Sequence, residues 1–149
     1  MFEIIKGSLL CADADAICQQ VNCRNAMGSG LAKAIYEKWP IVKTRYHELC
    51  GKQSDMADLL GDYQIIKDSG APFDIVNIFG QLDYGRDERE YTNYVALVAA
   101  FIELNSVYAG KTVAFPYLFG CGLAGGDWTI VESLILRYFT DCNVKIYKL

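Results

Sequence analysis

Two glycine-rich stretches, residues 21–32 and 115–128, constrain this chain more than any other feature of its sequence. Each follows a short apolar run typical of a β-strand and leads into a run with the spacing of a helix. Glycine permits close approach of a ligand, and backbone N–H groups at a helix N-terminus attract phosphate. The two loops together therefore predict a site for a pyrophosphate.

The rest of the pattern predicts an α/β fold. Strands are expected over residues 2–6, 16–22, 63–67, 73–79, 112–116 and 144–147, and helices over 31–39, 41–50, 91–108 and 127–140. The loop 68–72 carries Gly and Pro between two strand-like runs, which predicts an antiparallel hairpin. We expect a mixed central sheet sandwiched between helices, in one domain spanning 1–149, with ligand bound beyond the strand carboxyl ends.

Composition limits the classes of partner. The net charge of −4 offers no broad basic surface, so we expect no nucleic-acid partner. An anionic ligand would have to be held by local dipoles. No apolar run approaches the roughly 20 residues of a membrane helix, so no membrane partner is expected. The first residues lack the pattern of a secretory signal, which favours a soluble, cytoplasmic protein.

The six cysteines and the single histidine, His47, do not have the spacing of a metal site, so we expect no metal and no cofactor. Free cysteines of this kind are typically small buried apolar residues. Cys121 lies between two glycines, as a nucleophile on a tight turn does, but it would need a base. His47 falls on a helix with a surface pattern, which argues against a thiol hydrolase.

Taken jointly, the order, spacing and flanking strands of the two glycine-rich stretches resemble macrodomains, the ADP-ribose-binding family. The resemblance covers nearly the whole chain. The sequences of the two loops are most similar to those of phage and bacterial members, of the terminal ADP-ribose glycohydrolase-like branch, and of phosphatases that act on ADP-ribose 1″-phosphate. It implies a three-layer fold with ADP-ribose lying across the crest of the sheet.

The resemblance also implies which residues bind the ligand. The first stretch would line the diphosphate and the terminal ribose, and the second would surround the phosphates from the other side. Asn25 would approach the terminal ribose, with Asn22 three residues before it, although either asparagine can instead satisfy loop backbone. The full set implied is Ser8, Leu9, Asn22, Asn25, Met27, Gly28, Ser29, Gly30, Leu31, Pro116, Gly120, Cys121, Gly122, Leu123, Ala124 and Tyr147.

Two positions concern the adenine base. Many family members have an aspartate after the glycine that ends the first strand, whereas this chain has Ser8, which predicts looser adenine selectivity. A hydroxyl still accepts a hydrogen bond, but without the strength that a charge adds. Tyr147 stands where relatives have an aromatic residue, so it either stacks on the base or packs in the strand.

The catalytic pattern of the glycohydrolase-like branch is incomplete. A lysine would be expected near the end of the strand 73–79, but the segment continues as Gly80 and Gln81. Glutamine does not form a covalent adduct with an opened ribose. Asp127 is the acid of the second stretch, and it either orients a water for hydrolysis, together with Asn25, or caps a helix, which is the commoner role.

Two interpretations of the polar tract 83–90 remain. It either gates the pocket, with Arg86 or Arg89 contacting a phosphate, or is an ordinary solvated loop. The expected partners are ADP-ribose or an ADP-ribosylated small molecule or protein. The expected function is binding of ADP-ribose with hydrolysis of its terminal substituent, as an ADP-ribose 1″-phosphate phosphatase or an ADP-ribosyl ester hydrolase. The alternative is a non-catalytic reader of ADP-ribose.

Overall fold

A computed structural model describes residues 1–28 and 30–149, and within them six strands form one sheet in the order β1-β6-β5-β2-β4-β3. The strands are β1 (Phe2–Lys6), β2 (Ala16–Asn22), β3 (Tyr63–Ile66), β4 (Asp74–Gln81), β5 (Thr112–Pro116) and β6 (Asn143–Lys148). The helices are α1 (Gly30–Lys38), α2 (Ile41–Gly51), α3 (Tyr94–Val107) and α4 (Trp128–Tyr138), with short 3₁₀ turns η1 (Leu9–Cys11) and η2 (Met56–Leu59).

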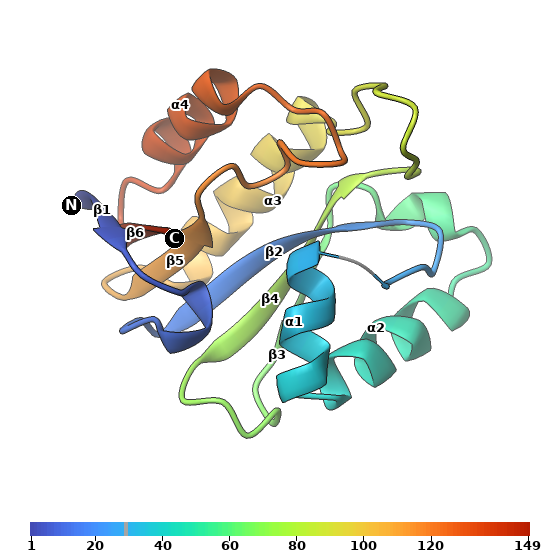
Figure 1. Cartoon of the computed structure of the whole chain (residues 1–149), viewed down its shortest axis with the longest axis horizontal. Coiled ribbons are helices and arrows are strands. Elements are labelled where there is room, and N and C mark those ends of the chain that lie inside the picture. The colour runs from blue at the N-terminus through green and yellow to red at the C-terminus, as the bar shows by residue number, and fades with distance from the viewer. Residues whose placement is uncertain (29) are drawn as a thin grey trace.

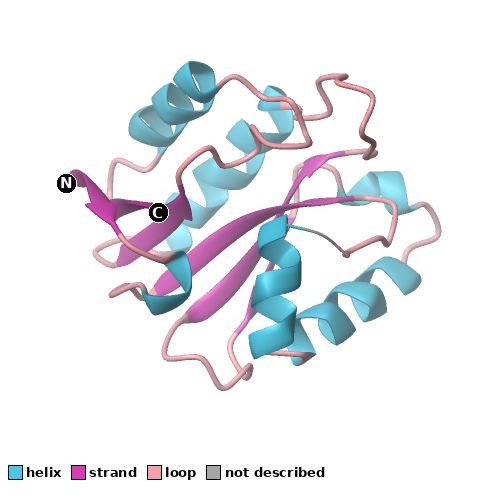
Figure 2. Cartoon of the chain, in the orientation of Figure 1, coloured by secondary structure: helices cyan, strands magenta, loops and turns pink. Residues whose placement is uncertain are grey.

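The elements form three layers (Figures 1 and 2). Helices α1 and α2 cover one face of the sheet, and α3 and α4 cover the other. Successive side chains of each central strand point to opposite faces of the sheet. In β2, for example, Ile17 packs with α1 and α2 while Cys18 packs with α3 and α4. The predicted mixed sheet between helices is confirmed.

Parallel pairing dominates the sheet. β2 pairs in parallel with both β4 and β5, and β5 pairs in parallel with β6. β3 alone among the described strands runs antiparallel, against β4, as the predicted hairpin requires. Because β5, β2 and β4 are neighbours with the same direction, the segments that follow them leave the sheet at one edge.

Capping residues explain where the elements depart from the predicted bounds. Helix α3 begins at Tyr94 rather than at residue 91, because Asn93 is its N-cap and accepts a hydrogen bond from the Ala96 N–H at 3.0 Å. The two preceding residues instead donate their N–H groups to the Ala124 carbonyl. The 3₁₀ turn η1, which the periodicity does not reveal, is capped by Ser8.

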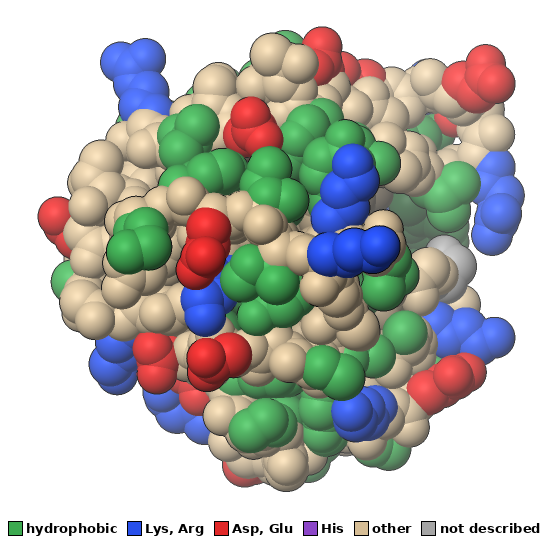
Figure 3. All heavy atoms as spheres, turned by 60° about the vertical axis from the view of Figure 1, so that its left-hand side comes forward, with side chains coloured by type: hydrophobic (Ala, Val, Ile, Leu, Met, Phe, Trp, Pro, Cys, Tyr) green, Lys and Arg blue, Asp and Glu red, His purple; other side chains and the backbone are tan. Residues whose placement is uncertain are grey.

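Charges are interspersed over the surface. On the face shown in Figure 3, Lys and Arg side chains lie among Asp and Glu side chains, with hydrophobic side chains between them. Among the described residues, no helix has the length and apolar character needed to cross a membrane.

The larger core cluster predicts a strong stability effect at one residue. Phe101 of α3 is fully buried, with its ring centroid 5.1 Å from that of Phe139 and 5.8 Å from that of Phe115. We expect Phe101→Ala to lower the free energy of unfolding by about 3–5 kcal/mol, because it leaves a cavity. Urea denaturation measures this. Val95→Ala on the same helix, at a side chain 80% exposed, should change it by less than about 0.5 kcal/mol.

Candidate functional site

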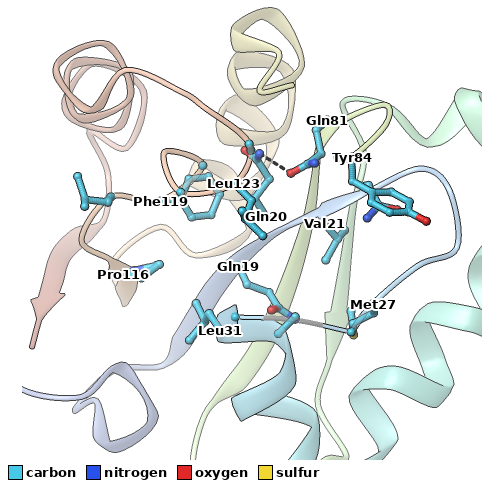
Figure 4. Close-up of a pocket in the computed structure, with 18 of the residues that line it drawn as sticks. Gln19, Gln20, Val21, Met27, Leu31, Gln81, Tyr84, Pro116, Phe119 and Leu123 are labelled. Carbon is cyan, nitrogen blue, oxygen red and sulfur yellow. Dashed lines mark hydrogen bonds between the residues drawn. The ribbon is translucent and has the colours of Figure 1, made fainter. Parts of the chain in front are cut away.

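A cavity of about 970 Å³ opens at the carboxyl ends of β5, β2 and β4. This volume lies near the upper end of the range for ligand pockets. Figure 4 shows side chains from both glycine-rich stretches around it. The described lining residues are 19–22, 26–28, 30–32, 81, 84–86, 116–120 and 122–124. The structure thus brings the two distant stretches to opposite walls of one cavity.

The first glycine loop, residues 23–28, is held by hydrogen bonds to Asn22 and Tyr46. The Asn22 side chain donates to the Ala26 carbonyl at 2.8 Å and accepts from the Arg24 N–H at 2.9 Å. The Tyr46 hydroxyl lies 2.8 Å from the Asn22 carbonyl and accepts from the Ala26 N–H at 3.2 Å. Burial raises the pKa of Tyr46, so this hydroxyl stays protonated. These bonds join the loop to the end of β2 and to Tyr46 of α2.

The second glycine loop, residues 117–127, contains glycines that the fold itself requires. Gly120 has φ +71°, and a Cβ there would lie 2.8 Å from Gln20 Oε1. Gly125 has φ +72°, and a Cβ there would lie 2.7 Å from the Arg89 carbonyl oxygen. Both the left-handed backbone and the close neighbours exclude a side chain at these positions.

Two other glycines have no such requirement. Gly28 and Gly122 line the cavity on opposite walls, and an added Cβ would meet no described atom within 4 Å at either position. Neither has a left-handed φ. Space at these positions is therefore open towards the cavity, and a bulky side chain would fill the volume in which a ligand would lie.

Backbone donors line the second wall. The N–H groups of Gly122, Leu123 and Ala124 donate to no backbone or side-chain atom among the described residues. Successive free N–H groups on a concave surface are a common way to bind an anion. On the first wall, α1 begins at Gly30, and the first residues of a helix likewise have unpaired N–H groups. By contrast, the start of α4 does not line the cavity, although the sequence pattern predicted helix N-termini at both loops.

The segment 82–92 forms a third wall. It is joined to the base of the first loop by the Cys23 N–H, which donates to the Leu82 carbonyl, and by an ion pair between Arg24 and Asp83 at 3.5 Å. It is joined to the second loop because the Tyr91 N–H donates to the Ala124 carbonyl at 2.7 Å. Tyr84, Gly85 and Arg86 of this segment line the cavity, whereas Arg89 is paired with Asp87.

Side-chain amides tie the three walls together. Gln20 Nε2 donates to Gln81 Oε1 at 2.9 Å and to Thr92 Oγ1 at 3.0 Å. Thr92 in turn donates to the Gly120 carbonyl, and Gln81 donates to the Asp83 carbonyl. Gln81 therefore acts as a structural link in this network.

The cavity has few groups that titrate near neutral pH. Its described lining residues include no Asp, Glu, His, Lys or Cys, and the only charge among them is that of Arg86. Cys121 is not a lining residue, and burial, followed by the charges of Asp127 and Glu90, raises its pKa to about 11. Its thiol donates to the Phe119 carbonyl. Cys121 is therefore protonated at neutral pH and does not supply a thiolate nucleophile.

The structure places the predicted ligand residues in two groups. Those that line the cavity are Asn22, Met27, Gly28, Gly30, Leu31, Pro116, Gly120, Gly122, Leu123 and Ala124. Those that do not line it are Ser8, Leu9, Asn25, Cys121 and Tyr147. The prediction for Ser29 lies outside the described residues.

The two predicted catalytic side chains make other contacts. Asn25, at φ +58°, is exposed, and its Oδ1 contacts His47 Nδ1. Asp127 is the N-cap of α4 and accepts from the Thr129 N–H at 2.8 Å. Neither belongs to the cavity lining, so their catalytic roles stay predictions.

The predicted adenine contacts also have structural partners. Ser8 Oγ accepts from the Leu10 N–H at 3.2 Å. Tyr147 is 8% exposed, and its hydroxyl accepts from the Asp13 N–H at 3.0 Å. The ring of Tyr147 packs in the same cluster as Leu9. These contacts agree with the strand-packing alternative for Tyr147.

The sequence did not reveal several lining residues, above all Gln19, Gln20, Gln81 and Tyr84, whereas Arg86 was predicted as a possible phosphate contact. A signal for the glutamines was present, because two adjacent amide side chains in an otherwise apolar central strand require buried partners. Nothing local distinguished Tyr84 from a residue of a solvated loop. Among the described residues, no cluster of three or more His, Cys, Asp or Glu side chains could hold a metal ion.

Comparison with known proteins agrees with this geometry. No family model matches the chain. The chain is 30% identical over 151 residues to a DNA ADP-ribosyl glycohydrolase of Mycobacterium tuberculosis, covering 95% of this chain and 40% of that protein. It thus spans about two fifths of the length of that relative. The solved macrodomain of Mycobacterium tuberculosis DarG is 28% identical, with a TM-score of 0.80, over 99% of this chain and 97% of that chain.

A further solved structure, Thermosipho africanus DarTG in complex with ADP-ribose, shares the fold. It is 19% identical, with a TM-score of 0.77, over 99% of this chain and 42% of that chain. The fold, the paired glycine loops and the similarity to the Mycobacterium macrodomain define the class. The chain belongs to the macrodomain family, as its two glycine-rich stretches predicted.

The anchoring of the first loop predicts the effect of losing one hydroxyl. Tyr46→Phe removes the hydroxyl that accepts from the Ala26 N–H and contacts the Asn22 carbonyl, both partly buried, so we expect the free energy of unfolding to fall by about 1–3 kcal/mol. Chemical denaturation tests this. Tyr36→Phe is the matched control, because the Tyr36 hydroxyl has no hydrogen bond within the described part of the chain. Equal losses in the two variants would contradict the anchoring role.

Proposed function

We propose that this chain binds ADP-ribose in the cavity between the two glycine loops and hydrolyses the bond that joins the terminal ribose to a substituent. Its similarity to two proteins supports this proposal: one is a DNA ADP-ribosyl glycohydrolase, and the other was solved in complex with ADP-ribose. Family membership supports the ligand class, and the finer choice of substituent rests on the residues of the cavity.

The observation that carries the proposal is the pair of open glycines on facing walls. Gly28 and Gly122 have neither a left-handed φ nor a close neighbour among the described residues to explain the absence of a side chain. Starting at Gly122, three successive N–H groups lack partners in the described structure. A diphosphate uses both features, because its oxygens must approach the backbone closely to accept those hydrogen bonds. The absence of carboxylates among the described lining residues removes the main source of repulsion.

The chemistry proposed for this cavity relies on oriented donors rather than on a side-chain nucleophile. Gln81 is engaged with Gln20 and the Asp83 carbonyl, and amides do not act as bases near neutral pH. Free N–H groups stabilise negative charge that develops on a phosphoryl or carbonyl oxygen as its bond breaks. This favours a terminal 1″-phosphate or an ester as the substituent. DNA-linked ADP-ribose should be assayed beside these two substrates, because one relative is a DNA ADP-ribosyl glycohydrolase.

A specific observation favours the second candidate, a reader without turnover. The described cavity lining has no Asp, Glu, His, Lys or Cys that could serve as general acid, base or nucleophile. Calorimetric titration with ADP-ribose, AMP and ADP measures binding. Incubation with ADP-ribose 1″-phosphate, ester-linked ADP-ribosyl protein and ADP-ribosylated DNA measures product release. Binding without release from any of the three would identify a reader.

Gly122 provides the direct test of the cavity. We expect Gly122→Val to weaken ADP-ribose binding at least about tenfold, which is about 1.4 kcal/mol, because the side chain would occupy the ligand's volume. Calorimetry measures the affinity. Gly51→Val is the matched control: Gly51 also has open space around its Cβ position but lies at the end of α2, away from the cavity. Unchanged affinity in a folded Gly122→Val protein would argue against this site.

Asp127 can be separated from its capping role by a substitution that keeps the cap. Asparagine caps helices about as well as aspartate. We therefore expect Asp127→Asn to keep the melting temperature and to keep whatever turnover the wild-type protein has. Asp127→Ala should lower stability by about 0.5–2 kcal/mol through loss of the cap. Loss of turnover in Asp127→Asn, with an unchanged melting temperature, would instead assign the carboxylate to catalysis.

A further inference from the structure

One buried side chain of the cavity wall has an unused hydrogen-bond acceptor. Gln19 of β2 is 2% exposed and lines the cavity, and its Oε1 has no hydrogen-bond partner among the described residues. Figure 4 shows its side chain reaching from β2 into the space between Leu31 and Met27. Buried polar atoms in proteins are nearly always paired, so an unpaired one on a residue that lines a cavity indicates a missing partner.

Three amide side chains fix which atom of Gln19 is left without a hydrogen-bond partner. Gln64 Nε2 donates to the backbone carbonyl of Arg45 at 2.9 Å, and that carbonyl can only accept. Gln64 Oε1 is then left to accept from Asn77 Nδ2 at 3.1 Å. Asn77 Oδ1 in turn accepts from Gln19 Nε2 at 2.7 Å. The Arg45 carbonyl of α2 therefore sets the donor and acceptor of each hydrogen bond in this series, and Gln19 Oε1 is left without a partner.

The neighbouring glutamine also has an unpaired oxygen, but glycines pack against it. Gln20 Oε1 lacks a hydrogen-bond partner among the described residues, as Gln19 Oε1 does. A Cβ added at Gly80 or at Gly120 would lie only 2.5 or 2.8 Å from Gln20 Oε1, whereas no described glycine lies comparably close to Gln19.

We propose that Gln19 Oε1 is a specificity-determining acceptor that selects a ligand with a hydrogen-bond donor at this point, and that Asn77 and Gln64 are positioning residues that hold it in this orientation. This inference rests on the proposed function, in which the ligand is ADP-ribose. The donor is then a ribose hydroxyl. A phosphate oxygen at the same point would meet another acceptor without a proton between them, so Gln19 also sets the register of the nucleotide along the cavity.

The test compares ligands and variants by calorimetry. The ligands are ADP-ribose and analogues that each have one ribose hydroxyl replaced by hydrogen. We expect Gln19→Met to weaken ADP-ribose binding about 10- to 100-fold. One analogue should bind the wild-type protein correspondingly weakly, and for that analogue Gln19→Met should make little further difference. That analogue identifies the ribose and the hydroxyl.

A matched control is available at Gln53, whose Nε2 also donates to a backbone carbonyl, that of Leu49, but which lies outside the cavity lining. Gln53→Met should leave all affinities unchanged. If the wild-type protein binds ADP-ribose and Gln19→Met binds every ligand as the wild type does, the inference fails while the proposed function stands. If the wild-type protein does not bind ADP-ribose, the proposed function fails, and this inference fails with it.

The positioning role has its own readout. Gln64 does not line the cavity, so a merely structural role would change the melting temperature without changing ligand selectivity. We expect Gln64→Met to reduce the preference for ADP-ribose over the identified analogue, because the Asn77 and Gln19 amides can then reverse. An unchanged preference would overturn this part of the proposal.

A measurement without any variant covers the case in which Gln19→Met does not fold. The ¹³C resonance of the Gln19 side-chain carbonyl in wild-type protein should shift on addition of ADP-ribose and shift much less with the identified analogue. Equal shifts with the two ligands, or no wild-type preference for any hydroxyl, would overturn the proposal.

Discussion

The parallel pairing of β2 with β4 on one side and β5 on the other is the constraint on which the site depends. Parallel strands end at the same edge, so this one arrangement brings together three segments that are far apart in the sequence. The segments are the first glycine loop after β2, the segment 82–92 after β4, and the second glycine loop after β5. Backbone hydrogen bonds and the Gln20 amide network then lock the segments to one another.

The glycines of this chain divide into two kinds when their surroundings are compared. Gly120 and Gly125 are required by their backbone angles and by close neighbours, and they shape the second loop. Gly28 and Gly122 have open space around them in the described structure, so the fold itself does not require the lack of a side chain there. A glycine-rich motif therefore combines residues that build the loop with residues that leave room for what binds there.

The cavity is suited to recognition by uncharged polar groups. Its described polar side chains are mainly amides, its unpaired donors are backbone N–H groups, and its charge comes from Arg86 on a segment that is itself tied to both loops. In a protein of net charge −4, the anion binding that we propose would depend on this local arrangement rather than on a broad basic surface. It also means that any hydrolysis here depends on how water and substrate are oriented.

Much of this could be foreseen from the order of the residues, because the relevant signals are local. Strand alternation, helical spacing and the hairpin residues are set by neighbours in the chain, and so are the glycine loops that mark the macrodomain family. The pairing of β2 with β4 and β5, the contribution of Tyr84 to the cavity wall, and the unpaired oxygen of Gln19 could not be foreseen in that way. They arise from contacts between residues separated by tens of positions, such as Gln19 with Asn77 and Gln20 with Thr92, whose geometry exists only once the sheet has formed.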